Sequence, residues 1–232
     1  NKKIPNKNKV YQEFKERYPT TTISELENVL VDIKSLANHY NKLINPKKEE
    51  DKDIQRELVY IDQLEINVTF PFLIKVYDDY VNSIISKSVF MEILLLVQSF
   101  SFRRFIVGLP TNALNKIFMN LYEKINKSDY LQSLKKSLVQ RAGVQRFPKD
   151  NEVREAIRTK DVYHIQAKNR IYFLERLENH ENPELVLIEG NQNITIEHIF
   201  PQNPDPKWKR DLGSEEYIFI KENYLNTIGN LT

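Results

Sequence analysis

The sequence contains no cysteine and only 5 glycines among 232 residues. The lack of cysteine excludes disulfides and thiolate zinc sites, so any metal must be held by histidine nitrogens and by oxygen ligands. It also permits an intracellular setting, and we expect a cytoplasmic protein. The scarcity of glycine favours helices. With 41% hydrophobic and 28% charged residues, the composition is that of a folded protein rather than a disordered one.

Long apolar runs and a strong net charge are also missing. The longest apolar run, Val89 to Val97, is interrupted by Glu92 and is far shorter than the roughly 20 residues that a membrane helix needs. We therefore interpret it as a buried core helix and expect no membrane partner. The 34 basic and 32 acidic residues leave a net charge of +2, so any DNA affinity must come from local patches. The start at Asn1 without Met and the end at Thr232 within an apolar-polar pattern indicate a cut chain.

Helical patterns fill most of the sequence. Between residues 23 and 44 the apolar residues recur at three-and-four spacing, which predicts an amphipathic helix that Pro46 ends. Ser86 or Ser88 is a suitable N-cap for the buried helix that follows, and Gly108 is suitable to end it. The same signals predict a helix that starts at Asp53 or its neighbours and continues through Leu58 and Ile61. They also predict helices near residues 71–84, 113–125 and 129–143 and after Asp150 and Asp161.

The pattern changes after Pro183. Residues 185–188 are β-prone, residues 189–193 have turn chemistry, and apolar and polar residues alternate around Ile194 and Ile196. This predicts a pair of strands, and residues 228–232 are suitable to begin another. The expected fold is thus mainly α, with a multi-helix body followed by a small α+β module from residue 184.

The most informative segment is Thr-Ile-Glu-His-Ile-Phe-Pro-Gln at residues 195–202, which Ile-Gly-Asn-Leu-Thr follows at residues 228–232. An imidazole has a pKa of about 6.5, so His198 could take a proton from water, as phosphodiester hydrolysis requires. Glu197 supplies the hard oxygen that Mg²⁺ or Mn²⁺ prefers. Neighbours on a regular strand point to opposite faces, so a site shared by Glu197 and His198 requires a bend there, which Pro201 makes plausible.

These two motifs resemble the DUF1524 branch of HNH nucleases. Residues 99–104 and 108–115 resemble the helical region that lies between DUF262 and DUF1524 in GmrSD-type proteins. The resemblance implies a type IV, modification-dependent restriction endonuclease, in which the DUF262 half hydrolyses a nucleotide and the DUF1524 half cuts DNA with Mg²⁺ or Mn²⁺. It further implies that His198 is the general base, that Glu197 is a metal ligand, and that Asn230 braces the loop that orients His198.

Two parts of the family pattern have no counterpart in this sequence. They are the metal-binding or phosphate-binding residue on the helix after Asn-Leu-Thr and the Asp-Gly-Gln-Gln-Arg signature of DUF262. We therefore expect residues 1–135 to be the helical region that follows a DUF262-like domain, including the end of that domain. Residues 136–183 would be a helical connector, and residues 184–232 a truncated, incomplete ββα-metal module. Such a fragment would cut little DNA alone.

Other interpretations stay open. Lys207, Lys209 and Arg210 surround Trp208 and could bind phosphates, although Trp208 could simply pack and leave the cations solvated. The position of Arg103 and Arg104 at the end of an apolar helix favours a structural role for them over DNA binding. The chain could be a helical interaction or scaffold module with a degenerate HNH end that only binds DNA, or an RNA-directed nuclease or toxin. The expected partners are modified DNA and other domains of the same protein, and an oligomer is possible.

Overall fold

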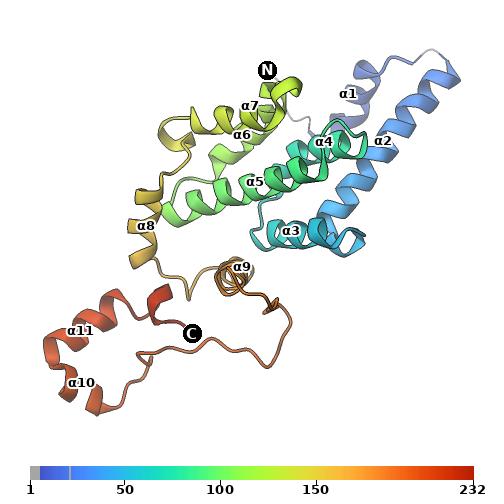
Figure 1. Cartoon of the computed structure of the whole chain (residues 1–232). Coiled ribbons are helices and arrows are strands. Elements are labelled where there is room, and N and C mark those ends of the chain that lie inside the picture. Colours follow the sequence, from blue (N-terminus) through green and yellow to red (C-terminus); the bar gives the residue numbers. More distant parts are fainter. Residues whose placement is uncertain (1–5, 21) are drawn as a thin grey trace.

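The computed structural model describes residues 6–20 and 22–232, so residues 1–5 of the expected first region lie outside the description. Eleven α-helices occur in these residues (Figure 1). Their bounds are α1 Val10–Arg17, α2 Ile23–Ile44, α3 Lys52–Gln63, α4 Phe70–Val81, α5 Lys87–Val107, α6 Asn112–Leu121, α7 Tyr130–Val139, α8 Asp150–Thr159, α9 Ala167–Glu178, α10 Pro206–Leu212 and α11 Ser214–Asn223. The expectation of a mainly helical protein is confirmed.

The ends of the two longest helices follow from their capping residues. The Thr22 hydroxyl accepts the Glu25 N–H at 3.2 Å, and the Glu25 carboxylate accepts the Thr22 N–H at 3.1 Å, so a capping box begins α2. The Ser86 hydroxyl accepts the Val89 N–H, as an N-cap of α5 does. Gly108 ends α5 with φ of 77°, a left-handed conformation that glycine adopts without strain. Both helices were predicted, α2 from its apolar spacing and α5 from the signals at Ser86 and Gly108.

The core of the body surrounds α5, which packs against α3, α4, α7 and α8. Figure 1 shows α5 running through the middle of the body. Phe90, Leu94, Val97 and Phe100 on this helix are buried, so the interpretation of the apolar run as a core helix is confirmed. In the part of the chain that the structure describes, no helix is both long enough and apolar enough to span a bilayer.

The predicted strand pair is not found, because residues 6–20 and 22–232 contain no β-strand. The backbone of residues 185–189 instead bonds to side chains of α9 and the residue after it. Asn179 accepts the Val186 N–H at 2.7 Å and donates to the Val186 carbonyl at 2.8 Å. The Glu175 carboxylate accepts the N–H groups of Ile188 and Glu189 at 2.7 and 2.9 Å. These side chains replace the second strand, and the ββα arrangement is therefore not confirmed.

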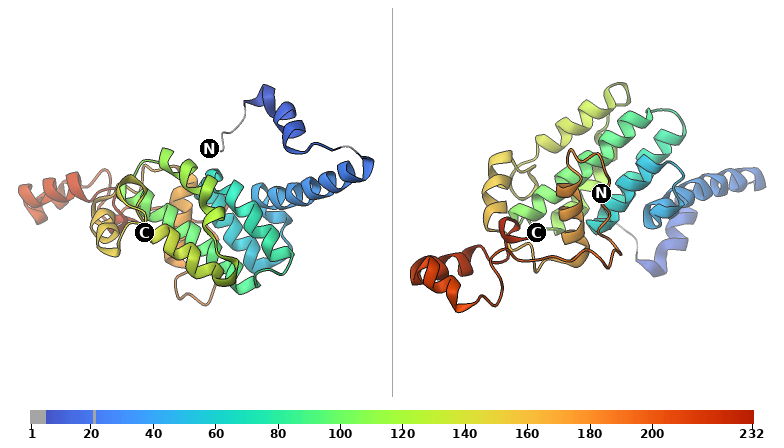
Figure 2. Two further views of the ribbon diagram at one scale, coloured as in Figure 1. Left: turned by 90° about the horizontal axis from the view of Figure 1, so that it is seen from above. Right: turned by 60° about the horizontal axis from the view of Figure 1, so that its bottom comes forward.

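A second, small apolar cluster joins the C-terminal region to the body. Val162, Phe173 and Leu231 are buried together, and Phe102 of α5 packs against them. In both views of Figure 2 this region extends from one end of the body, with α10 and α11 farthest out. The segments before α10 and after α11 therefore meet near α8 and α9.

Candidate functional site

His198 lies on a short extended segment that pairs with the last residues of the chain. It forms an isolated antiparallel bridge with Leu231. Glu197 and Thr232 exchange backbone hydrogen bonds of 2.8 and 2.9 Å, and the Ile199 N–H donates to the Asn230 carbonyl at 2.9 Å. The two sequence motifs, about thirty residues apart, are thus directly paired. The strand expected at residues 228–232 is not formed, because residues 228–230 make a 3-10 turn and the bridge is confined to Leu231.

The side chain of Asn230 holds these motifs together. It is buried, and its Oδ1 accepts the Phe200 N–H at 2.6 Å while its Nδ2 donates to the Phe200 carbonyl at 3.0 Å. Nδ2 also donates to the Leu225 carbonyl at 2.8 Å. We call these three bonds the Asn230 clamp. The clamp fixes the backbone at Phe200, two residues after His198.

The imidazole of His198 is half-buried between two groups that the sequence interpretation did not single out. The ring of Tyr163 lies edge-on to it, with 4.6 Å between ring centroids. Nε2 lies 3.4 Å from Oδ1 of Asn226. The Asn226 carbonyl in turn accepts the N–H groups of Val162 at 2.8 Å and Tyr163 at 3.2 Å. Tyr163 and Asn226 are therefore tied to each other as well as to His198.

Neither of these two residues carries a strong sequence signal. Asn226 precedes Ile-Gly-Asn-Leu-Thr by only one residue, and its position just before that motif is the one sign that pointed to it. Tyr163 lies in the loop between α8 and α9, far from either motif along the chain. Only the packing of Val162 in the small apolar cluster brings Tyr163 to the histidine.

Glu197 does not share a contact with His198. Its carboxylate is exposed and accepts the Thr195 hydroxyl at 3.3 Å, whereas His198 faces Tyr163. This is the alternation of a regular extended segment, so the bend that a shared site requires is not present at these residues. Across residues 6–20 and 22–232 no three His, Asp or Glu side chains group as metal ligands. The described donors do not form a complete Mg²⁺ or Mn²⁺ site.

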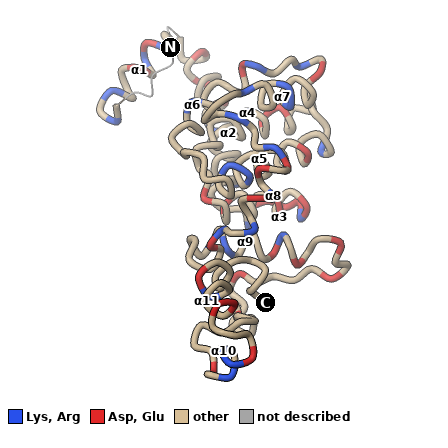
Figure 3. The backbone as a smooth tube through the Cα atoms, turned by 90° about the vertical axis from the view of Figure 1, so that its left-hand side faces the viewer, with Lys and Arg blue, Asp and Glu red and all other residues tan. Residues whose placement is uncertain are grey.

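Helix α10 presents three cations, Lys207, Lys209 and Arg210, which we call the α10 cations. All three are exposed, and Figure 3 shows basic residues of α10 at the end of the C-terminal region. Trp208 between them packs edge-on against Phe200, with 5.3 Å between ring centroids. The packing role for Trp208 is confirmed. Because Phe200 is also the residue that the Asn230 clamp holds, the clamp supports both His198 and α10.

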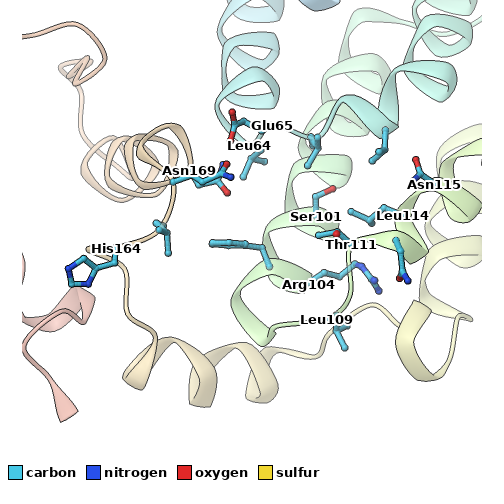
Figure 4. A pocket seen from close by; sticks show the side chains of 16 residues that line it. Leu64, Glu65, Ser101, Arg104, Leu109, Thr111, Leu114, Asn115, His164 and Asn169 are labelled. Atoms are coloured by element: carbon cyan, nitrogen blue, oxygen red, sulfur yellow. The ribbon is translucent and has the colours of Figure 1, made fainter. Parts of the chain in front are cut away.

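A cavity in the body lies apart from this site (Figure 4). Ser101 and Arg104 of α5 line it, and His164 lies at one end. Arg104 is buried, and its guanidinium donates to three backbone carbonyls, those of Val144 at 2.8 Å, Pro110 at 2.9 Å and Arg146 at 3.2 Å. Arg103 pairs with Asp150 at 2.5 Å. Both arginines thus have structural contacts, but neither pairs with a buried carboxylate, because Asp150 is exposed and Arg104 binds carbonyls.

These features define a class of protein. A histidine beside a backbone clamp and exposed cations on the next helix are groups that can accept a proton and contact phosphates. A comparison with protein families gives a specific match, because residues 147–232 match the C-terminal domain of the GmrSD restriction endonucleases. Searches of curated proteins and of solved structures give no significant match. The resemblance to GmrSD-type restriction endonucleases is therefore supported over residues 147–232, which are similar to that family's C-terminal domain.

Proposed function

We propose that this chain carries part of the DNA-cutting site of a modification-dependent, type IV restriction endonuclease, with His198 as the general base. The observation that carries the proposal is the Asn230 clamp, which joins the two motifs and fixes the backbone next to His198. The family match over residues 147–232 supports DNA as the substrate. The domain boundaries, the DUF262-type partner domain and a cytoplasmic location remain parts of the same proposal.

The hydrogen bond to Asn226 suggests how His198 is prepared to accept a proton. If Nε2 carries the hydrogen and donates it to Oδ1 of Asn226, Nδ1 is the basic nitrogen of the ring. In the described part of the chain no group hydrogen-bonds Nδ1. A water molecule there would lose its proton to Nδ1 while its oxygen bonds to phosphorus. The bond from phosphorus to the leaving oxygen then breaks, and that oxygen takes a proton from solvent water, which completes hydrolysis.

A divalent ion is part of the proposed site, in addition to the proton transfer to His198. Mg²⁺ or Mn²⁺ would stabilise the charge that develops on the phosphate oxygens, and Glu197 offers one exposed carboxylate for it. Because Glu197 and His198 face opposite sides, Glu197 alone is a weak, single-residue contact. We expect the 232-residue chain by itself to bind Mn²⁺ weakly and to cut little DNA. Titration calorimetry with Mn²⁺ checks the first point, and tight binding that survives Glu197→Ala would place the metal elsewhere.

The α10 cations are the proposed contact to the phosphate backbone. They are exposed and lie on a helix that Phe200 anchors, next to the segment of His198. Arg210 lies 3.5 Å from the carboxylate of Asp211. Both side chains are exposed, so a phosphate can replace Asp211 as the partner of Arg210. Lys207 and Lys209 have no ion pair with any described residue. These contacts would position DNA without reading its sequence.

The test is cleavage of modified DNA by the natural protein in Mg²⁺ or Mn²⁺, with matched RNA as a second substrate. We expect His198→Ala to lower DNA cleavage by about 100-fold or more, as the loss of a general base does. His180→Ala is the control because His180 is exposed and remote from both motifs. Equal cleavage by wild type and His198→Ala would reject the assignment. Cleavage of RNA but not DNA would favour the RNA-directed alternative, and DNA binding without cleavage would favour the scaffold alternative.

A further inference from the structure

Helix α2 has an apolar stripe in addition to the residues that pack against the body. Its apolar residues alternate at spacings of three and four along the whole helix, which is the a and d pattern of a coiled coil. The residues at these positions are Ile23, Leu26, Leu30, Ile33, Ala37, Tyr40 and Ile44. We call them the α2 seam. The helix has 22 residues, so the seam covers about three heptads and about 33 Å.

The body contacts the α2 seam only near its C-terminal end, where the Tyr40 ring packs edge-on against Phe70 of α4 with 6.1 Å between ring centroids. The buried residues of α2 are His39 and Leu43, which lie on another side of the helix and face α3 and α4. Ile23 is 78% exposed, Leu30 52% and Ile33 41%. Both views of Figure 2 show the N-terminal part of α2 projecting from the body. A helix with polar surroundings would not retain such a seam without a partner, because exposed apolar area is unfavourable.

We propose that a second copy of this chain covers the seam, with the two α2 helices forming a short antiparallel coiled coil. In that arrangement Leu30 lies opposite the partner's Ile33, and Leu26 lies opposite the partner's Ala37. The a residues Ile23, Leu30 and Ala37 thus each meet a d residue, so that these layers are apolar, whereas Ile44 lies beyond the end of the partner helix.

The flanking residues select the antiparallel arrangement. Glu27 and Lys34 follow the d residues, at the same heptad position, and both are exposed without an ion pair to any described residue. In an antiparallel pair this position meets itself, so Glu27 lies near the partner's Lys34, and the two-fold axis repeats the contact. On the opposite flank Val29 meets the partner's Leu36. A parallel pair would instead place Lys34 beside the partner's Val29, which loses the charge complementarity.

A hollow at the base of α2 provides room for the tip of the partner helix. It is lined by Tyr40 and Ile44 of the seam together with Phe70, Pro71 and Ile74 of α4. In the antiparallel register the partner's Ile23 comes beside Tyr40, at this hollow. The residue with the most exposed apolar side chain of the seam thereby meets a hollow that is partly apolar, since Asp62 and Asn67 also line it. Because α2 is already folded and anchored by Leu43, association need not also order the helix.

Sedimentation velocity of the whole chain tests the proposal. We expect a concentration-dependent dimer, and we expect Leu30→Glu to weaken it more than about tenfold, because a carboxylate would be buried without a partner. Val31→Glu is the matched control, since Val31 is the next residue, equally apolar and 65% exposed, but lies off the seam. A monomer at every concentration, or a dimer that Leu30→Glu leaves unchanged, would overturn the proposal. Circular dichroism verifies that both variants remain helical.

Two further variants test the orientation. Lys34→Glu should weaken the dimer, and the double variant Glu27→Lys with Lys34→Glu should restore it, because the opposite charges are exchanged. The natural absence of cysteine also permits a clean cross-linking experiment. Leu30→Cys and Ile33→Cys should form a disulfide-linked dimer when the two proteins are mixed and oxidised, but not when each is oxidised alone. Efficient cross-linking of each variant with itself would instead show a parallel pair and overturn the arrangement.

Discussion

Asn230→Ala removes the clamp, and the resulting loss of stability can be worked out from the three hydrogen bonds. The substitution leaves the N–H and the carbonyl of Phe200 and the carbonyl of Leu225 without their partner. Each bond contributes about 1 kcal/mol net, so the C-terminal region should lose about 3 kcal/mol of stability. That loss changes the local folding equilibrium by roughly a hundredfold.

The single tryptophan makes this loss measurable. Trp208 packs on Phe200, so its fluorescence reports on the C-terminal region, whereas circular dichroism reports mainly on the helical body. In urea, Asn230→Ala should move the fluorescence transition to lower denaturant and leave the dichroism transition nearly in place. Asn223→Ala is the control, because that exposed amide makes one bond, to the Phe219 carbonyl.

The chemistry of the amide can be separated from its size. Asn230→Asp keeps the acceptor for the Phe200 N–H but places a second oxygen against the carbonyls of Phe200 and Leu225. It should therefore destabilise the region at neutral pH at least as much as alanine does. A change of less than about 0.5 kcal/mol in the free energy of unfolding that fluorescence measures for Asn230→Ala, similar to the change for Asn223→Ala, would refute the clamp.

Three other predictions concern DNA binding and the body. Replacing the α10 cations by alanine should lower the salt dependence of DNA binding by up to about 2.7 in the logarithmic slope, measured by fluorescence anisotropy, and an unchanged slope would argue against them. Burial raises the pKa of Glu49, but hydrogen bonds from Tyr77 and Lys42 outweigh it and leave the pKa below the usual 4.5. The stabilisation is therefore present above about pH 4.5 and is lost as the pH falls through the lowered pKa. Glu49→Gln should cost about 2 kcal/mol at pH 7, and urea titrations should show this difference shrinking toward zero in acid; a constant difference would contradict the assignment. Arg104→Lys should lower the melting temperature, because one ammonium cannot serve three separated carbonyls, and an unchanged value would contradict the structural role.

The helices were predictable because their signals are local. Thr22 and Glu25 mark the start of α2, and Ser86 and Gly108 mark both ends of α5, within a few residues of the positions that they control. The contact of Asn230 with the segment of His198 was also predictable, since both motifs that it joins are visible in the sequence. Periodicity alone did not show, however, that the apolar stripe of α2 stays largely outside the body.

The sequence predictions that were wrong or incomplete concern contacts between segments that are distant along the chain. Residues 185–188 have β-prone side chains, yet Asn179 and Glu175 supply the hydrogen bonds that a strand would otherwise provide. Tyr163 reaches His198 through tertiary packing, which no spacing rule describes. The side-chain direction of Glu197 likewise depends on whether the segment bends, and the sequence permits both outcomes.

Chemical rescue tests the role of His198 most directly. The natural protein with His198→Gly has space for a free imidazole beside Tyr163 and Asn226. Cleavage of modified DNA is measured in Mn²⁺ with and without added imidazole, with 1-methylimidazole as a second base and His180→Gly as the control. If His198 is the general base, the glycine variant loses most of its activity and imidazole restores part of it. Full activity of His198→Gly without any added base would contradict the account.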